Sequence, residues 1–524
     1  MQFLRRFAIC LAIATWCFLT TWVELAEGDS VYYARFNPVA TNVIPVLCWE
    51  LIIALALWAV WELIRRVHLE EGANIALLCL AASAVPFGIG AVAALRLSPW
   101  NLLPFVRYRW LWPAAAVAAI VPVVLAIRRP RLCCRVLASV FLYSWPVLAL
   151  LMFQGLRTTI APYPAAAYED GPLATRLEDI PRVRVVWIIF DELSQAIAFS
   201  GRPAGLALPN LDQARAESFF ATAAKSPADS TQLSMPALTL GEDVVEATQS
   251  GTRDLRLKTR TRSEPFSWNA VPNVFDDARG LGFNTALVGW FHPYGRLLNR
   301  SLTKCFWVAG WQLPGIEESF QPPALASAMA DRLKLQFITL PLVGHLPMVQ
   351  TGIYERRSKR ERYSYLMTNA KQVVADPSVG LALVHLSLPH PPSLGESAGG
   401  YLEGVRRVDE SLGALRRAMI EAHLWDRSAV LISADHGWRT SIWRGTPDWN
   451  SNDEAASRQD TSGVPFLLKL PGQAEGAVYN KPFNTVVTRQ VIDRILEGQL
   501  TDAGDIAESI ERIQLQTPSI SNAR

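Results

Sequence analysis

The feature that most constrains this chain is a series of long apolar stretches in its first third. Each could form a helix that crosses the roughly 30 Å hydrocarbon core of a membrane at about 1.5 Å per residue. Hydrophobic residues make up 50% of the 524-residue sequence and its mean hydropathy is +0.16, which is too apolar for a wholly soluble protein. We therefore expect residues 1–157 to form a bundle of five transmembrane helices. The stretches are Phe7–Val23, Val43–Ile64, Asn74–Leu97, Trp110–Ile127 and Val136–Leu156.

The arginines beside these stretches predict the orientation of the bundle. Cytoplasmic loops are enriched in Lys and Arg, so the N-terminus is predicted inside, and five crossings place everything after Arg157 outside the cytoplasm. The first stretch starts like a secretory signal, but four more stretches follow, and we expect it to be retained as a helix. One side carries Arg5, Arg6, Arg65, Arg66, Arg128, Arg129, Arg131 and Arg135, whereas Arg35, Arg96, Arg107 and Arg109 lie in or beside the opposite loops.

Charge and cysteine usage limit the function of the remaining chain. Residues 1–157 hold 13 of the 50 Lys and Arg residues and 7 of the 47 Asp and Glu residues, so the rest carries a net charge of −3. Without a basic patch, a nucleic-acid partner is not expected. Cys305 is the single cysteine after residue 157, which excludes an internal disulfide there. Within the second apolar stretch, Glu50 marks either a lipid-headgroup site or a carboxylate that is protonated or snorkels at the interface.

After a linker at 158–181, the pattern becomes that of a layered α/β domain, which we place at 182–490. Continuous apolar runs at Val183–Phe190, Leu381–Leu388 and Ser428–Ser433 are typical of strands buried on both faces of a mostly parallel sheet. Helical patterns such as Tyr401–His423 lie between them, so we expect helices to flank the sheet. Residues 491–524 are predicted to form a C-terminal helix and a polar tail, with the tail from Ile510.

Acidic and histidine residues follow each of the three predicted strands. Asp191-Glu192 follows the first, His390 the second and Asp435-His436 the third. The carboxyl ends of parallel strands share one edge of a sheet, so these groups are predicted to meet there and hold a divalent metal. For each cluster alone, a helix cap is the alternative.

The order of the sequence blocks around these residues resembles the alkaline phosphatase and sulfatase superfamily. The five-helix anchor additionally resembles bacterial phosphoethanolamine transferases and lipoteichoic acid synthases, which join such an anchor to an external catalytic domain. The similar blocks are VVWIIFDELS (185–194), PNLDQARAESFFATA (209–223), STQLSMPALTLG (230–241), GFNTALVGWFH (282–292), HLSLPHPP (385–392), YLEGVRRVDESLGALRRAM (401–419), LISADHGW (431–438) and VPFLLKLPG (464–472).

This resemblance implies a role for each candidate residue. Asp191, with Glu192, matches the first metal-ligand position, and Asp435 with His436 matches the later pair. Thr231 matches the nucleophile, with Ser230 as the adjacent alternative. A Thr hydroxyl is a poor nucleophile at neutral pH, so the metal must also bind Thr231 and lower its pKa. The alternative is a Ser/Thr cluster that only caps a helix at Ser234.

Three histidines also match or adjoin the blocks of that superfamily. His390 and His292 match positions that contact substrate or protonate the leaving oxygen, and Ser230 is placed with them in the substrate site. A buried structural histidine is the alternative for each. His385, inside an apolar strand, is expected to be structural.

Two departures from the superfamily pattern narrow the expected chemistry. Sulfatases carry Cys or Ser in the motif Cys/Ser-x-Pro-x-Arg, whereas this chain has Thr-Gln-Leu-Ser-Met from Thr231. Sulfatases also carry a Lys before the histidine of the GFNTALVGWFH block, where this chain has Gly-Trp-Phe at 289–291. Both differences favour phosphate over sulfate. Before Val464, the histidine of two-metal phosphatases is replaced by Gln-Asp-Thr at 459–461, so one metal is expected, although Asp460 could substitute. Zn²⁺ or Mn²⁺ is the leading candidate, with Ca²⁺ or Mg²⁺ as alternatives.

The expected function is transfer or hydrolysis of a phosphate ester of phosphoethanolamine or phosphoglycerol type through Thr231. The substrate would be a membrane lipid or a lipid-linked or envelope glycan. The site would face the periplasm or exterior from a multi-pass protein of a bacterial-type inner membrane. The alternatives are a sulfuric-ester or phosphonate-type ester hydrolase of the same fold, and an inactive sulfatase-like module for envelope assembly or binding.

Overall fold

The computed structural model describes most of the chain as two compact units. The described residues are 2–27, 39–67, 128–159, 170–174, 183–250, 254–309, 324–338, 351–395, 399–444, 446 and 448–516. One unit contains the described residues up to 159 together with 324–338, and the other contains nearly all the rest. Residues 324–338 lie inside the range 182–490 predicted for the catalytic domain, but they group with the N-terminal helices.

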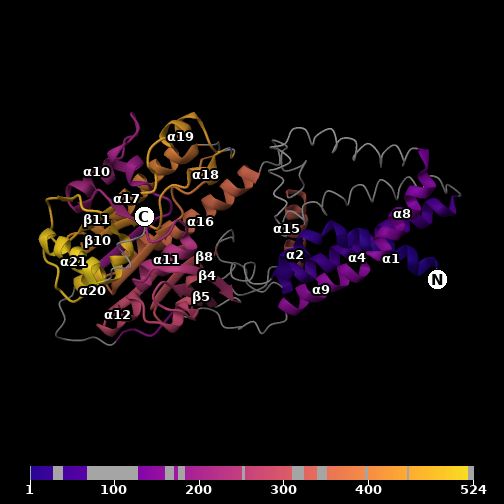
Figure 1. The fold of residues 1–524 in the computed structure, drawn as a ribbon, viewed down its shortest axis with the longest axis horizontal. Coiled ribbons are helices and arrows are strands. Elements are labelled where there is room, and N and C mark those ends of the chain that lie inside the picture. The colour runs from indigo at the N-terminus through magenta and orange to yellow at the C-terminus, as the bar shows by residue number, and fades with distance from the viewer. Residues whose placement is uncertain are drawn as a thin grey trace. The chain divides into compact units, whose positions relative to one another are not determined.

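The described part of the first unit consists of helices and the short turns between them (Figure 1). The sequence of helix α4 (Ile44–Arg66) explains where this helix begins and ends. Pro45 lies in its first turn, and Arg65 and Arg66 lie in its last turn, where positive charge interacts favourably with the helix dipole. The helices are α1 (Gln2–Cys17), α2 (Leu19–Glu27), α4 (Ile44–Arg66), α8 (Pro130–Tyr143), α9 (Trp145–Thr159) and α15 (Leu325–Ile338), with a π-helical turn, η1 (Val39–Val43).

Within the described part of the chain, two helical segments are long and apolar enough to cross a membrane. They are Val39–Arg66 and Arg131–Arg157, which correspond to the second and fifth predicted spans. The first predicted span falls on two shorter helices, α1 and α2, that are separated at Phe18. The third and fourth, Asn74–Leu97 and Trp110–Ile127, lie outside the described residues. The described structure therefore shows two of the five expected spans.

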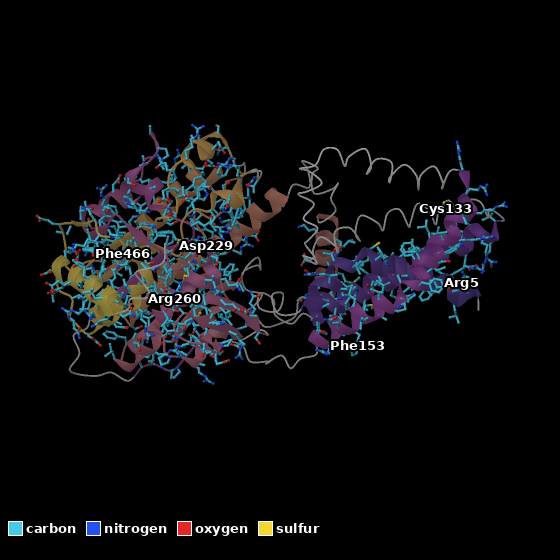
Figure 2. All side chains as sticks on the ribbon, viewed as in Figure 1. Arg5, Cys133, Phe153, Asp229, Arg260 and Phe466 are labelled. Carbon is cyan, nitrogen blue, oxygen red and sulfur yellow. The ribbon has the colours of Figure 1, made fainter. Side chains whose placement is uncertain are left out.

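Side-chain contacts tie the helices of this unit together. Arg6 forms an ion pair with Glu62, so the start of α1 meets the end of α4. Figure 2 shows Arg5 and Cys133 toward one end of the unit and Phe153 toward the other. Helix α15 forms two hydrogen bonds with the N-terminal helices: the indole N–H of Trp49 donates to the carbonyl of Met329 over 2.9 Å, and the amide of Gln336 donates to Thr21 Oγ1 over 2.8 Å. These bonds account for the grouping of α15 with the apolar helices.

The second unit is an α/β domain with a largely parallel eight-stranded sheet, as predicted. The strand order is β12-β2-β11-β10-β1-β9-β7-β8, and only β11 runs antiparallel to its neighbours. The bounds are β1 (Arg184–Phe190), β2 (Phe219–Ala221), β7 (Asn284–Phe291), β8 (Lys304–Ala309), β9 (Val379–Leu386), β10 (Ser428–Ala434), β11 (Phe466–Lys469) and β12 (Ala477–Tyr479).

The three apolar runs expected to be buried strands are the centre of this sheet. Every residue of β1 and β10 is buried, and β9 is buried except Gly380. Burial on both faces is what a continuous β-branched and apolar run favours. The predicted strands differ from the observed ones by one or two residues at their ends.

Helices pack in two groups on the sheet (Figure 1). α10 (Pro209–Ala216) contacts α17 (Gly400–Glu421), whereas α11 (Thr231–Leu240), α12 (Val274–Gly280) and α20 (Thr488–Leu496) contact one another. Two small sheets complete the unit: β4 (Val244–Ser250), β5 (Asp254–Thr259) and β6 (Phe266–Ser267), and β3 (Ala224–Lys225) with β13 (Phe483–Asn484). Further helices are α13 (Tyr294–Leu297), α16 (Thr351–Val374), α18 (Thr440–Trp443), α19 (Ser451–Ala456) and α21 (Ala503–Gln516), with short turns at Ala196–Ser200, Trp268–Ala270 and Thr485–Val487.

The C-terminal segment differs from the expectation of a polar tail from Ile510. Helix α21 continues to Gln516, and Ile506, Ile510 and Ile513 are buried along one face of it. Apolar residues at these spacings fall on one side of a helix, which is why the segment packs on the domain. Residues 517–524 lie outside the described part of the chain.

Candidate metal and catalytic site

The register of the central strands brings the predicted acidic residues together. Phe190 at the end of β1 pairs with Ala434 at the end of β10, so Asp191 and Asp435, the next residue on each strand, emerge beside each other. Phe190 also pairs with Leu386 of β9, whose carbonyl accepts the N–H of Asp191 over 3.0 Å. The ends of these strands thus fix both carboxylates at one edge of the sheet, as predicted.

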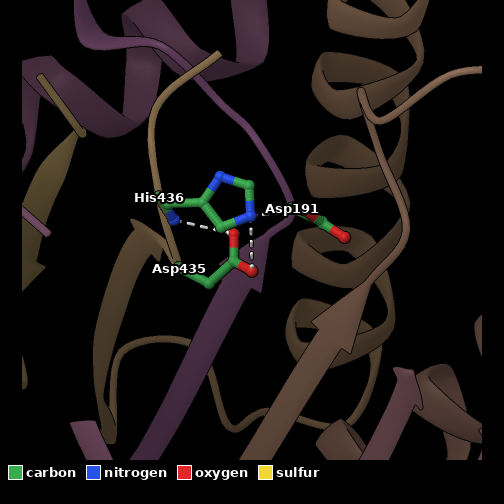
Figure 3. Close-up of side chains that lie close together, drawn as sticks. All are labelled: Asp191, Asp435 and His436. Carbon is green, nitrogen blue, oxygen red and sulfur yellow. Dashed lines mark hydrogen bonds and ion pairs between the residues drawn. The ribbon is translucent and has the colours of Figure 1, made fainter. Parts of the chain in front are cut away.

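Asp191, Asp435 and His436 form a compact group of possible metal ligands (Figure 3). One ligand atom from each lies within 4.8 Å of the others. His436 Nε2 is 3.5 Å from Asp191 Oδ1 and 3.5 Å from Asp435 Oδ2. All three side chains are completely buried. A group of this composition and spacing could be bridged by one cation.

Two further observations fit a divalent cation at this group. Both carboxylate oxygens of Asp191 are buried without a hydrogen-bond partner, and burial, followed by the charges of Asp435 and Glu192, raises the pKa of Asp191 well above its usual value. A buried charge in that position needs a cation to compensate it. His436 Nδ1 donates to the carbonyl of Gly437 over 2.9 Å, which leaves the lone pair of Nε2 directed at the carboxylates.

Oxygen and nitrogen donors of this kind suit Zn²⁺ or Mn²⁺. Burial alone would raise the pKa of Asp435. That pKa is instead held below its usual value by the neighbouring His436 and His385 and by the hydrogen bonds from Thr231 and from the N–H of Glu192. Asp435 is therefore ionised and ready to bind a cation.

Thr231 is placed beside this group by the start of helix α11. Its Oγ1 donates to Asp435 Oδ2 over 2.7 Å and lies 3.3 Å from His436 Nε2. The helix begins directly after Ser230, whose backbone is extended, and ends at Gly241 in a left-handed conformation that favours glycine. The first-turn N–H groups of α11 also face this end of the helix, where an anion is stabilised.

Glu192 adjoins the group, but its carboxylate has other partners. Its φ of +67° is a left-handed conformation uncommon for a non-glycine residue, and its N–H donates to Asp435 Oδ1 over 3.2 Å. The buried carboxylate accepts hydrogen bonds from Arg439 Nε and, over 2.7 Å, from Trp443 Nε1. Glu192 is thus near the predicted ligands while its side chain is engaged with Arg439 and Trp443.

The predicted substrate residues lie around the same group. His390 is nearly buried between the rings of Trp290 and Trp443, at centroid distances of 5.1 and 4.7 Å, and its backbone N–H donates to the carbonyl of Asp191. Burial, followed by the charges of Lys359 and Arg439, lowers the pKa of His390 well below its usual value. Ser230 is partly exposed at the start of α11.

His292 and His385 are fully buried in the wall of the site. His292 Nε2 donates to the carbonyl of Thr231 over 3.1 Å, so it supports the backbone of Thr231, and burial lowers the pKa of His292 to about 3. His385, expected to be structural, contacts the hydroxyl of Tyr294 through Nδ1 at 3.0 Å. Its Nε2 lies 3.9 Å from Asp435 Oδ2.

Several neighbours of the site were not singled out from the sequence. Lys359 of α16 is buried and donates to the carbonyl of His390, and burial lowers its pKa to about 7. Tyr401 of α17 donates from its hydroxyl to the carbonyl of Glu192 over 2.7 Å. A Lys in a polar helix and a Tyr at a helix start give no sequence signal for these positions. Arg439 stands four positions after Asp435, which is a signal of proximity.

Asp460, considered as a substitute ligand, does not join the group. It is exposed and accepts hydrogen bonds from the N–H and the hydroxyl of Ser462. The neighbouring Gln459 donates to the carbonyl of Gly201 over 2.7 Å. Among the described residues, the ligand candidates that meet are Asp191, Asp435 and His436, with Thr231 in contact.

Comparison with known proteins gives similarity only to solved structures. No family model matches the chain, and no curated protein matches it. A phosphonate monoester hydrolase of Agrobacterium radiobacter is 15% identical, with a TM-score of 0.40 over 61% of this chain and 78% of that one. A sulfatase from Pseudoalteromonas sp. is 16% identical, with a TM-score of 0.41 over 62% and 69%. A protein in the alkaline phosphatase superfamily from Vibrio parahaemolyticus is 13% identical, with a TM-score of 0.37 over 64% and 72%.

Proposed function

We propose that this chain is a metal-dependent enzyme of the alkaline phosphatase and sulfatase superfamily that uses Thr231 to cleave or transfer a phosphate ester. The observation that carries the proposal is the contact of the Thr231 hydroxyl with Asp435 Oδ2 and His436 Nε2, beside a buried Asp191 carboxylate with no hydrogen-bond partner. A hydroxyl held by prospective metal ligands is the arrangement that nucleophilic catalysis needs.

The reaction would proceed by attack of Thr231 Oγ1 on phosphorus. The new Oγ1–P bond forms as the bond from phosphorus to the leaving oxygen breaks. Thr231 passes its hydroxyl proton to Asp435 Oδ2, to which it is hydrogen-bonded, and the leaving oxygen takes up a proton from water. A divalent cation held by Asp191, Asp435 and His436 would lower the pKa of the hydroxyl and stabilise charge on the nonbridging oxygens. Water or an acceptor hydroxyl would then release the group from Thr231, giving hydrolysis or transfer.

His390 suits the second half of this reaction. Its Nδ1 contacts the carbonyl of Pro391, which can only accept, so Nδ1 carries the proton and Nε2 has the lone pair. The lowered pKa keeps the ring neutral. In this state Nε2 of His390 can accept a proton from the attacking water or hydroxyl, a role that adds to the substrate contact or protonation of the leaving oxygen expected from the sequence.

The apolar helices of the first unit favour a substrate at a membrane. Val39–Arg66 and Arg131–Arg157 have the length and composition of spans. We propose a multi-pass protein of a bacterial-type inner membrane whose second unit lies outside the cytoplasm and acts on a lipid or a lipid-linked glycan. Phosphoethanolamine or phosphoglycerol would be the transferred group.

The proposal is tested with the full chain purified in detergent. Metal content is measured, and turnover of bis-nitrophenyl phosphate, nitrophenyl phosphate, a phenylphosphonate ester and nitrophenyl sulfate is compared for wild type and Thr231→Ala. Labelled phosphatidylethanolamine and phosphatidylglycerol are then tested for diacylglycerol release, and mass spectrometry is used to find phosphate on Thr231. Turnover of the sulfate or phosphonate ester alone would favour the ester-hydrolase alternative. A chain that binds no metal and turns over none of these compounds would favour the inactive module.

A further inference from the structure

The guanidinium of Arg439 is anchored on one side by a buried carboxylate. Arg439 Nε donates to Glu192 Oε1, and the other oxygen of Glu192 accepts the indole N–H of Trp443 over 2.7 Å. The Glu192 side chain is fully buried, whereas 24% of the Arg439 side chain is exposed. Glu192 and Trp443 therefore hold one end of a cation whose other end reaches the surface of the site.

The terminal nitrogens of Arg439 have no acceptor in the described part of the chain. Within that part of the chain, its side-chain hydrogen bond and its ion pair both join Nε to Glu192. Arginine presents further N–H donors in a planar fork that matches two oxygens of a phosphate or a related tetrahedral anion. A guanidinium fixed through Nε has these donors pre-organised, so little conformational entropy is lost when an anion binds.

Arg439 also lies within electrostatic reach of the reacting groups. It follows Asp435 and His436 on the same loop, and its charge acts on Asp191 and on His390. His390 and Arg439 share a neighbour, because Trp443 contacts the imidazole ring and donates to Glu192. The cation is thus placed on the edge of the sheet where Thr231 and the prospective metal ligands meet.

Neutralisation of Glu192 explains only part of this arrangement. A buried carboxylate that already accepts an indole N–H needs a counter-charge, and a lysine would supply it. The exposed fork of donors is not needed for that purpose. A bound oxyanion that has more oxygens than a single metal cation contacts would accept hydrogen bonds from this fork.

We propose that Arg439 is a second cationic group of the site, which binds a nonbridging oxygen of the transferred phosphoryl group while Glu192 positions it. The inference rests on the proposed function and deepens it, because it assigns the ligand as a tetrahedral oxyanion held between a metal and a guanidinium. It also gives Glu192 a task as a positioning residue in place of metal binding.

The test measures binding of inorganic phosphate by titration calorimetry to the metal-loaded full chain in detergent. Arg439→Gln is expected to weaken phosphate binding about 10- to 100-fold, since a charge-assisted contact is lost. Arg439→Lys is expected to recover only part of the loss. Arg444→Gln is the matched control, because Arg444 lies in the same region but pairs with Glu454 at an exposed site, and it should bind phosphate as the wild type does.

A structural role for Arg439 is distinguished by two further readouts. Metal binding should change little in Arg439→Ala, whereas its thermal midpoint should fall because buried Glu192 loses its counter-charge. Added guanidinium ion should restore its phosphate affinity. Phosphate binding that is unchanged in Arg439→Gln, a loss that guanidinium does not reverse, or a wild type that binds no phosphate would each overturn the proposal. A wild type that binds phosphate through Arg439 but turns over no ester would instead refute the proposed function.

Discussion

Thr231 donates a hydrogen bond from Oγ1 to Oδ2 of Asp435 over 2.7 Å, although 204 positions separate the two residues. The start of α11 supplies the hydroxyl, and the end of β10 supplies the carboxylate. The same carboxylate oxygen lies 3.5 Å from His436 Nε2. Because the hydroxyl of Thr231 contacts Asp435 and His436, changing it tests the chemistry of the site.

Thr231→Ala is expected to lower turnover of bis-nitrophenyl phosphate by on the order of 10⁴-fold, because the nucleophile is removed. Thr231→Ser keeps a hydroxyl and should retain measurable turnover. Thr501→Ala is the control in the C-terminal segment: its exposed hydroxyl bonds to Asp505, so turnover should be preserved. The turnover rates are measured by steady-state kinetics at saturating metal. A fully active Thr231→Ala would exclude Thr231 as the nucleophile.

Asp191→Asn is expected to have opposite effects with and without metal. In EDTA it should raise the stability of the fold by about 1–3 kcal/mol, since it removes a buried charge that has no hydrogen-bond partner and is repelled by Asp435 and Glu192. With Mn²⁺ or Zn²⁺ present, the stabilisation seen in the wild type should be largely lost. Thermal denaturation in both conditions measures this crossover, and a variant less stable in EDTA would contradict the account of Asp191.

His292 is expected to make the fold sensitive to acid. Burial lowers its pKa to about 3, whereas an unfolded histidine takes up a proton near pH 6.5. The unfolded state therefore binds more protons as the pH falls from about 6.5 to about 3, and stability decreases over that window. His292→Gln keeps a donor for the Thr231 carbonyl and should show a shallower decrease. Urea midpoints followed by tryptophan fluorescence at several pH values compare the slopes, and equal slopes would be evidence against this role.

Arg184 is expected to be essential for stability. Its buried guanidinium donates to the carbonyls of Val379 and Val374 over 2.8 Å and of Val373 over 2.9 Å, which joins the end of α16 to strands β1 and β9. Arg184→Leu leaves these carbonyls without donors and should cost about 3 kcal/mol or more. Arg417→Leu, at an exposed position of α17, should stay within about 0.5 kcal/mol of the wild type in the same urea titration.

The central sheet was predictable because its strands carry an unusually direct signal. Burial on both faces requires a continuous apolar run, and such runs occur at β1, β9 and β10, each followed by the residues that now meet. Strand β11 gave no comparable signal, since its three apolar residues and one lysine fit a strand of either direction. The antiparallel placement of β11 depends on its pairing with β10 and β2.

The position of the Glu192 side chain could not be read from the sequence. Adjacent acidic residues after a strand can both be ligands, and what separates them is a left-handed backbone at Glu192 and the partners Arg439 and Trp443. These partners follow the third strand, more than 240 positions later. Similarly, the polar bonds that group α15 with the apolar helices join residues about 300 positions apart, which no local pattern reveals.

The grouping of α15 with the N-terminal helices has a practical consequence for anyone who wants to handle the α/β unit alone. The backbone enters that unit at residue 166, leaves it after residue 320 for α15 and returns at residue 352, so the unit cannot be excised with one cut. A fragment that began at residue 166 would still contain α15. In it, Met329 and Gln336 would lack their hydrogen-bond partners Trp49 and Thr21. A soluble fragment would need a short loop spliced in place of 321–351.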